Sequence, residues 1–190
     1  MNDVDSLFHF IFPIIAVLAA RLNIKHIIKT AVAAASITVL LDMDHVIGIS
    51  RASLHNVFVT ILFPLVLIYF AFHFRTSKYV KGFFLLVLIF MSSHLFLDLF
   101  STDFQGGIGI GEGTGVSLFY PLSLAKYYVS FNIGIQQGLI VSSLGFGILL
   151  YFIIIIVPCL FLDDIIEIAE RKHESLRKAA WSFFRNAIKD

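Results

Sequence analysis

His94 and Asp98 lie four residues apart in the segment MSSHLFLDLF (residues 91–100), which is otherwise mostly apolar. Residues four apart share one face of an α-helix, about one turn from each other. An imidazole and a carboxylate placed in this way can bind one metal ion without bending the backbone, and both are ligands of Zn²⁺ and Mn²⁺. The pair therefore predicts a metal site at the end of an apolar helix.

The composition of the chain is that of a membrane protein. Of its 190 residues, 58% are hydrophobic and 14% are charged, and the mean hydropathy is +0.91. Ordinary globular domains have roughly 45–50% apolar and about 25% charged residues. The net charge of +1 gives no indication of a nucleic-acid partner. Cys159 is the single cysteine, which excludes an internal disulfide and a cysteine-based metal cluster.

Five apolar segments are each near the roughly 17–25 residues that cross a bilayer. They cover residues 7–22, 27–45, 54–74, 79–100 and 134–161. Residues 163–190 mix charges with apolar residues at helical spacing, which predicts either an amphipathic helix on the membrane surface or a solvated helix packed on the bundle. We expect an all-α polytopic bundle over 1–162, followed by a cytoplasmic amphipathic helix over 163–190.

The basic residues predict the orientation of the bundle. Twelve of the fourteen Lys and Arg fall within residues 21–29, 75–81 and 171–189. Because basic residues mark the cytoplasmic side of short loops, an odd number of spans places the N-terminus outside and the C-terminus in the cytoplasm. The long Gly-rich connection over residues 101–133 then lies outside, and we expect it to be a flexible loop or lid.

With this orientation, seven ionisable residues gather at the outer ends of four spans. They are His9, Asp42, Asp44, His45, His55, His94 and Asp98. Taken singly, each His could be a hydrogen-bonded packing residue, and the two Asp near residue 43 could simply end a helix. Each such group costs roughly 2.5–3.5 kcal/mol at the centre of a span and less near its end. Taken together they favour a cation that offsets this cost.

The order of these motifs resembles that of a bacterial and archaeal family of membrane-bound, metal-dependent hydrolases. The resemblance covers about residues 7–125. It rests on His9 and on LLDMDH (40–45), SRASLHN (50–56), SSHLFLDLF (92–100) and LFYPLS (118–123). One departure is Ser50, which stands where the family has a His.

This resemblance implies a set of site residues. The implied metal ligands are His9, Asp44, His55, His94 and Asp98, while Asp42 and His45 would be ligands or lie just behind them. The order of His and Asp residues is also distantly similar to that of zinc-dependent phospholipases C.

The leading hypothesis is a hydrolase that acts on a lipid or lipid-linked phosphoester at the outer membrane face. The metal would be zinc, with manganese or magnesium as alternatives. Asp42 and His45 are the predicted catalytic residues, with Asp42 accepting a proton from water, and Arg51 and Asn56 are predicted to bind the substrate. The chain contains neither HExxH nor GxSxG, which disfavours a zincin or a serine hydrolase.

Two other functions fit the same ligands. A metal-ion transporter would need polar residues that continue to the cytoplasmic side, where the spans are mostly Leu, Ile, Val, Phe and Ala. A metal-binding membrane protein without hydrolase activity is the other alternative.

Overall fold

The computed structural model describes residues 3–22, 26–100, 107–111, 115–130, 132–135 and 138–187. The fold is mainly helical, as predicted. Its α-helices are α1 (Asp3–Ala20), α2 (Ile27–Val39), α3 (Asp44–Ile47), α4 (Phe63–His73), α5 (Lys78–Asp98), α6 (Ser143–Leu160) and α7 (Leu162–Ala187). Short 3-10 turns cover Leu40–Met43 and Arg51–Ser53, and a π-helical turn covers Phe58–Leu62.

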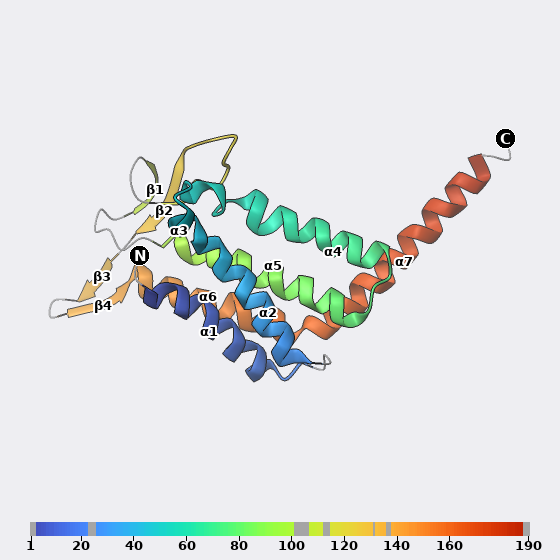
Figure 1. The fold of residues 1–190 in the computed structure, drawn as a ribbon, viewed down its shortest axis with the longest axis horizontal. Coiled ribbons are helices and arrows are strands. Elements are labelled where there is room, and N and C mark those ends of the chain that lie inside the picture. Colours follow the sequence, from blue (N-terminus) through green and yellow to red (C-terminus); the bar gives the residue numbers. More distant parts are fainter. Residues whose placement is uncertain are drawn as a thin grey trace.

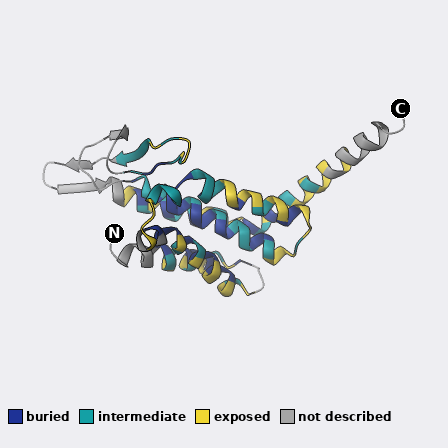
Figure 2. Ribbon diagram, turned by 45° about the horizontal axis from the view of Figure 1, so that its top comes forward, coloured by how far each residue is buried: buried dark blue, intermediate teal, exposed yellow. Residues whose placement is uncertain are grey.

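Helix α5 is the centre of the bundle, with α2, α4 and α6 packed against it and α1 packed against α2 and α6 (Figure 1). Its side chains are buried along much of the helix, whereas α4 has an exposed outer face (Figure 2). The apolar side chains buried between the helices include Val17, Leu86, Phe90 and Ile155. A helix that is apolar on nearly all sides is expected at such a central position.

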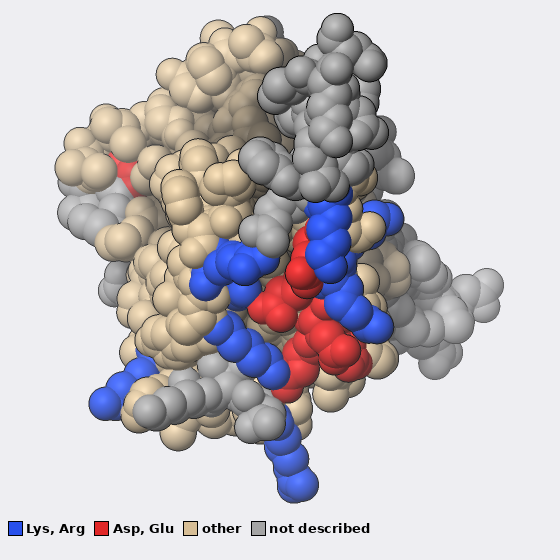
Figure 3. Space-filling view, turned by 90° about the vertical axis from the view of Figure 1, so that its right-hand side faces the viewer, with Lys and Arg blue, Asp and Glu red and all other residues tan. Residues whose placement is uncertain are grey.

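The two ends of the bundle differ in their residues. The strands, the 3-10 turns and the C-terminal end of α5 lie at one end, while the α4–α5 connection and the junction of α6 with α7 lie at the other (Figure 1). Figure 3 looks at this second end, where Lys and Arg side chains surround a group of Asp and Glu side chains. Lys and Arg side chains thus gather at the end opposite the predicted metal ligands, while Arg51 and Lys126 lie at the strand end.

Two helical segments are long and apolar enough to cross a membrane, namely Arg51–His73 and Lys78–Asp98. A third would be the bent pair Gly145–Leu160 and Leu162–Leu176, which meet at 59°. The described part of the chain thus contains two to three candidate spans, against the five predicted for the whole chain. Helix α2 has 13 residues because the backbone tightens into a 3-10 turn at Leu40, before Asp42 and Asp44.

The predicted start of the fifth span at residue 134 is wrong, since β3 (Asn132–Ile135) pairs antiparallel with β4 (Gly138–Ser142). Alternating Ile and Gly residues favour a strand there, because Gly disfavours helix and β-branched side chains favour sheet. The Gly-rich connection is also not wholly a loop, because β1 (Gly107–Gly111) pairs with β2 (Lys126–Ser130).

Helix α7 packs against the bundle through its first part. Leu162 and Ile166 are buried in the core, and Glu170 accepts a hydrogen bond from Lys81 Nζ at 2.6 Å. This part of the helix matches the predicted alternative of a helix packed on the bundle. The rest of α7 extends away from the other helices (Figure 1).

Candidate metal centre

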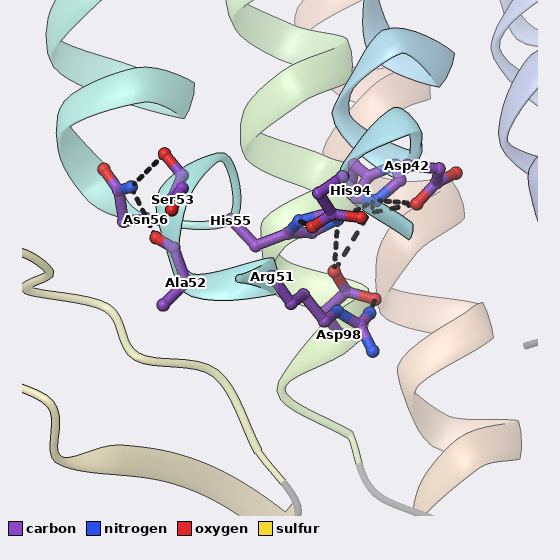
Figure 4. A network of polar contacts seen from close by, with 9 residues as sticks. Asp42, Arg51, Ala52, Ser53, His55, Asn56, His94 and Asp98 are labelled. Carbon is purple, nitrogen blue, oxygen red and sulfur yellow. Dashed lines mark hydrogen bonds and ion pairs between the residues drawn. The ribbon is translucent and has the colours of Figure 1, made fainter. Parts of the chain in front are cut away.

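Three separate segments bring their side chains together at the strand end of the bundle (Figure 4). His94 and Asp98 come from the last turns of α5. Asp42 comes from the 3-10 turn that follows α2, and His55 follows the 3-10 turn at Arg51–Ser53. The i, i+4 spacing on α5 therefore places the imidazole and carboxylate side by side, as predicted from the sequence.

Four polar atoms form a compact group at the centre of this site. The Nε2 atoms of His55 and His94 are 3.2 Å apart. Asp42 Oδ1 lies 3.5 Å from the first of these nitrogens and 3.4 Å from the second. Asp98 Oδ2 lies 3.5 Å from each. Five atom pairs thus have nearly the same separation.

Three of these donors have the separations expected around a single tetrahedral ion. Zinc binds imidazole nitrogens and carboxylate oxygens at about 2.0–2.1 Å, so the corners of a regular tetrahedron lie about 3.3–3.4 Å apart. The three distances that join Asp42 Oδ1, His55 Nε2 and His94 Nε2 to one another, 3.2–3.5 Å, match this edge length. Asp42, His55 and His94 therefore form a group that could hold one zinc-sized ion.

Asp44 lies next to the ring nitrogen of His55 that is not part of the central group. Asp44 Oδ2 lies 3.0 Å from His55 Nδ1, and both side chains are fully buried. In a neutral imidazole one nitrogen carries the proton and the other carries the lone pair. A proton on Nδ1, next to the Asp44 carboxylate, would leave the Nε2 lone pair facing Asp42 and His94, which is the tautomer that a metal ligand needs.

The charges of the acidic residues at the site favour a cation. Asp42, Asp44 and Asp98 contribute three negative charges and Arg51 one positive charge, so with neutral imidazoles the net charge of these residues is −2. Their carboxylates are nearly or fully buried. Buried charges are expensive unless they are paired or bind a metal. A divalent cation would neutralise the site.

His9 extends the site toward α1 and α6. Its ring lies against that of His94, with centroids 3.9 Å apart, and the edge of Tyr151 meets it at 5.7 Å. His9, His94 and Asp98 form a second set with donor atoms within 4.8 Å of one another. His94 belongs to both sets, and a neutral imidazole has one lone pair with which to bind a metal. The two sets are therefore alternative sites for a single ion and would not hold two ions at once.

Arg51 connects the buried site with its surroundings. Its Nη2 atom donates to Asp98 Oδ1 at 2.7 Å, and 36% of its side chain is exposed. Asp98 therefore faces the two histidines with one oxygen and the guanidinium with the other. An Arg fork has five N–H donors, so this contact leaves further donors for an anion.

Asn56 uses its polar atoms within its own turn. Its Nδ2 donates to the backbone oxygens of Ala52 and Ser53 at 2.8 and 3.0 Å, and its Oδ1 accepts from the backbone N–H of Val59 at 3.0 Å. These bonds connect the 3-10 turn with the π-helical turn and fix the backbone next to His55. This use of the side chain favours a positioning role over the predicted contact with substrate.

The structure brings together the predicted ligands but suggests different roles for two of them. His55, His94 and Asp98 are in the central group, and His9 is adjacent to it. Asp42, predicted as a proton acceptor, lies in the ligand position, and Asp44, predicted as a ligand, lies behind His55. The side chain of His45 lies outside the described residues.

Tyr151 is a residue of the site that the sequence analysis missed. It is fully buried on α6 and packs against His9. Its signal in the sequence is that it is the single polar side chain in the apolar run over residues 147–157. A polar aromatic residue in such a run marks a place where the helix faces a polar group rather than lipid.

The chain was also compared with known proteins. No protein-family model, curated protein or solved structure matches it. The resemblance to membrane-bound, metal-dependent hydrolases therefore stays a prediction that rests on the motifs quoted above.

Proposed function

We propose that the chain is a membrane-embedded, metal-dependent hydrolase of a lipid or lipid-linked phosphoester, with its site at the outer membrane face. The observation that supports this most strongly is the group of near-equal distances among the donor atoms of Asp42, His55 and His94, which could hold one ion with Asp98 beside it. A bound divalent ion, zinc by preference, would supply Lewis-acid polarisation of an ester oxygen and acidification of water.

The proposed topology has five spans, with the N-terminus outside and the C-terminus in the cytoplasm. Its support is the separation of basic residues from the metal site at opposite ends of the bundle. In this topology α1 and α2 cross the membrane as shorter segments, and the strands lie outside.

In this proposal the side chains of the site have separate roles in metal binding, proton transfer and phosphate binding. Asp42, His55 and His94 hold the ion, and Asp44 orients His55 through Nδ1. Asp98 Oδ2 accepts the proton of the attacking water, since its other oxygen is held by Arg51. The free N–H groups of Arg51 bind a phosphate oxygen and stabilise negative charge that develops on it.

A metal-binding protein without hydrolase activity is the second candidate. It is favoured by the position of Asp98 Oδ2, which is as close to the two histidines as a fourth ligand would be. Zinc sites with four protein ligands are structural, whereas catalytic sites keep one position open. The role of Asp98 therefore separates the two candidates. Transport is disfavoured because the core between the two ends is largely apolar.

The test measures bound metal and lipid hydrolysis in the same purified protein. The wild type should contain about one ion per chain and hydrolyse phospholipid, and His94→Ala should lose both. Asp98→Asn should keep the metal and lose hydrolysis by at least about 100-fold, which is the usual contribution of a general base. Asp164→Asn, at the other end of the bundle, is the matched control and should change neither.

Two results would contradict the proposal. Metal content that is unchanged in His94→Ala would exclude this metal site. Loss of metal in Asp98→Asn, together with no hydrolysis of any lipid by the wild type, would favour the metal-binding protein without hydrolase activity.

A further inference from the structure

An apolar groove lies on the side of the bundle where α2 and α4 pack on α5. It encloses about 210 Å³ and is lined entirely by Ile, Leu, Val, Phe and Met side chains. Helix α5 lies between α2 and α4, and each of these packs on α5 (Figure 1). The groove has α5 as its floor, with α2 and its 3-10 turn on one side and the π-helical turn and α4 on the other.

Three residues that line the groove are close in sequence to residues of the metal centre. Among its lining residues, Leu41 precedes Asp42 and Leu54 precedes His55. Met91 lies three residues before His94 on α5, which places the two on neighbouring positions of one helical face. From Met91 the floor continues to Phe83, a distance of roughly 12 Å along the helix axis at 1.5 Å per residue.

The dimensions and chemistry of the groove fit a hydrocarbon chain. An apolar cavity of about 150 Å³ lined by Leu, Ile and Phe holds a benzene molecule. A groove of 210 Å³ is therefore large enough for a somewhat longer run of carbon atoms. Its rim is open, since Leu40 and Phe63 are each more than half exposed. A chain can thus enter from the side rather than through the end of the bundle.

We propose that this groove binds an acyl chain of a glycerophospholipid whose phosphate lies at Arg51 and the metal centre. This inference deepens the proposed function and rests on it, because it identifies the substrate as a diacyl lipid and gives its direction of binding. The chain extends from Leu41 and Met91 toward Leu67 and Phe83, parallel to α5. A lipid in the outer leaflet has this same orientation, with its head group outward and its chains toward the membrane centre.

The role of the groove is positional. Lipid tails are as apolar as Leu side chains, so the transfer of a chain from the bilayer to the groove gains little from the hydrophobic effect. Packing against a fixed wall instead limits the positions of the head group near the site. Holding a reacting group in place in this way is a major source of rate enhancement.

The test uses photoreactive phospholipids in nanodiscs and does not depend on turnover. One probe carries a diazirine near the end of an acyl chain, and a second carries it close to the glycerol. The first should label the region of Leu67 and Phe83, and the second the region of Leu41, Leu54 and Met91. Labelled peptides are identified by mass spectrometry.

Two variants of α4 make a matched pair. Leu67→Trp fills the far end of the groove and should reduce labelling by the chain-end probe several-fold, with labelling by the other probe and metal content unchanged. Leu65→Trp lies on the same helix but outside the groove lining, where it is exposed, and should change none of these.

The outcomes separate this inference from the proposed function. Equal labelling in the two Trp variants, or label spread over the outer face of α4, would overturn the acyl-chain site. The reverse order of labelling by the two probes would overturn the proposed direction. Correct labelling by both probes with no hydrolysis would retain the lipid site and contradict the hydrolase.

Discussion

The two ends of the helix bundle both carry ionisable residues, but they balance their charges differently. At the end formed by the α4–α5 connection and α7, carboxylates have Lys or Arg partners, as in the pairs Lys78–Asp163 and Lys81–Glu170. At the strand end, the described contacts place three carboxylates and two buried histidines near the guanidinium of Arg51. In the first arrangement carboxylates are paired with basic side chains, whereas the second includes a buried His/Asp group that could hold a metal ion.

Removal of metal should have the largest effect, and it should act through the strand end alone. At a free metal concentration about 100 times Kd, binding contributes about 2.7 kcal/mol to the free energy of unfolding. For a chain of this length that corresponds to a fall in Tm of about 5–10 °C on chelation. Thermal unfolding followed by circular dichroism, with and without chelator, measures this fall in Tm. His94→Ala should show no such shift, and an equal shift in that variant would contradict the comparison.

Asp44→Asn should have the next largest effect, because it removes one charge while keeping the shape of the side chain. Carboxylates that orient metal-binding histidines typically contribute 10–100-fold to metal affinity. We expect about a tenfold loss, since the Asn oxygen can still lie next to His55 Nδ1 although the negative charge is lost. Competition with a chelator of known affinity measures this. A loss as complete as that in His94→Ala would instead make Asp44 a direct ligand.

Lys81→Ala should have the smallest effect, and it should act at the other end. Lys81 is nearly buried, pairs with Glu170 at 2.6 Å and lies over the Phe72 ring at 5.1 Å. Because Glu170 is 46% exposed and stays hydrated, the expected destabilisation is about 1–2 kcal/mol.

The matched control for this change is Lys178→Ala, which removes an exposed i, i+4 pair with Glu174. Its expected effect is about 0.3–0.5 kcal/mol. Bound metal should be the same in both variants as in the wild type. A loss of metal from Lys81→Ala would show that the two ends of the bundle are not independent.

The sequence predicted the metal centre better than it predicted the fold. The i, i+4 pair His94 and Asp98 was visible because helical spacing fixes which residues share a face. The separate roles of Asp42 and Asp44 could not be predicted from the sequence, because the 3-10 turn between α2 and α3 changes the direction of each side chain. Apolar periodicity alone could not show that residues 134–142 form strands rather than a helix.

The π-helical turn at Phe58–Leu62 has a geometric consequence for this chemistry. A π-turn accommodates one residue more than the α-turn it replaces, and one residue corresponds to a rotation of about 100° around the helix axis. The residues before the turn, including His55, are therefore rotated relative to the outer face of α4. Shortening the turn by one residue would preserve the apolar helix but direct the imidazole away from the carboxylates. The direction in which His55 points relative to the outer face of α4 thus depends on this π-helical turn.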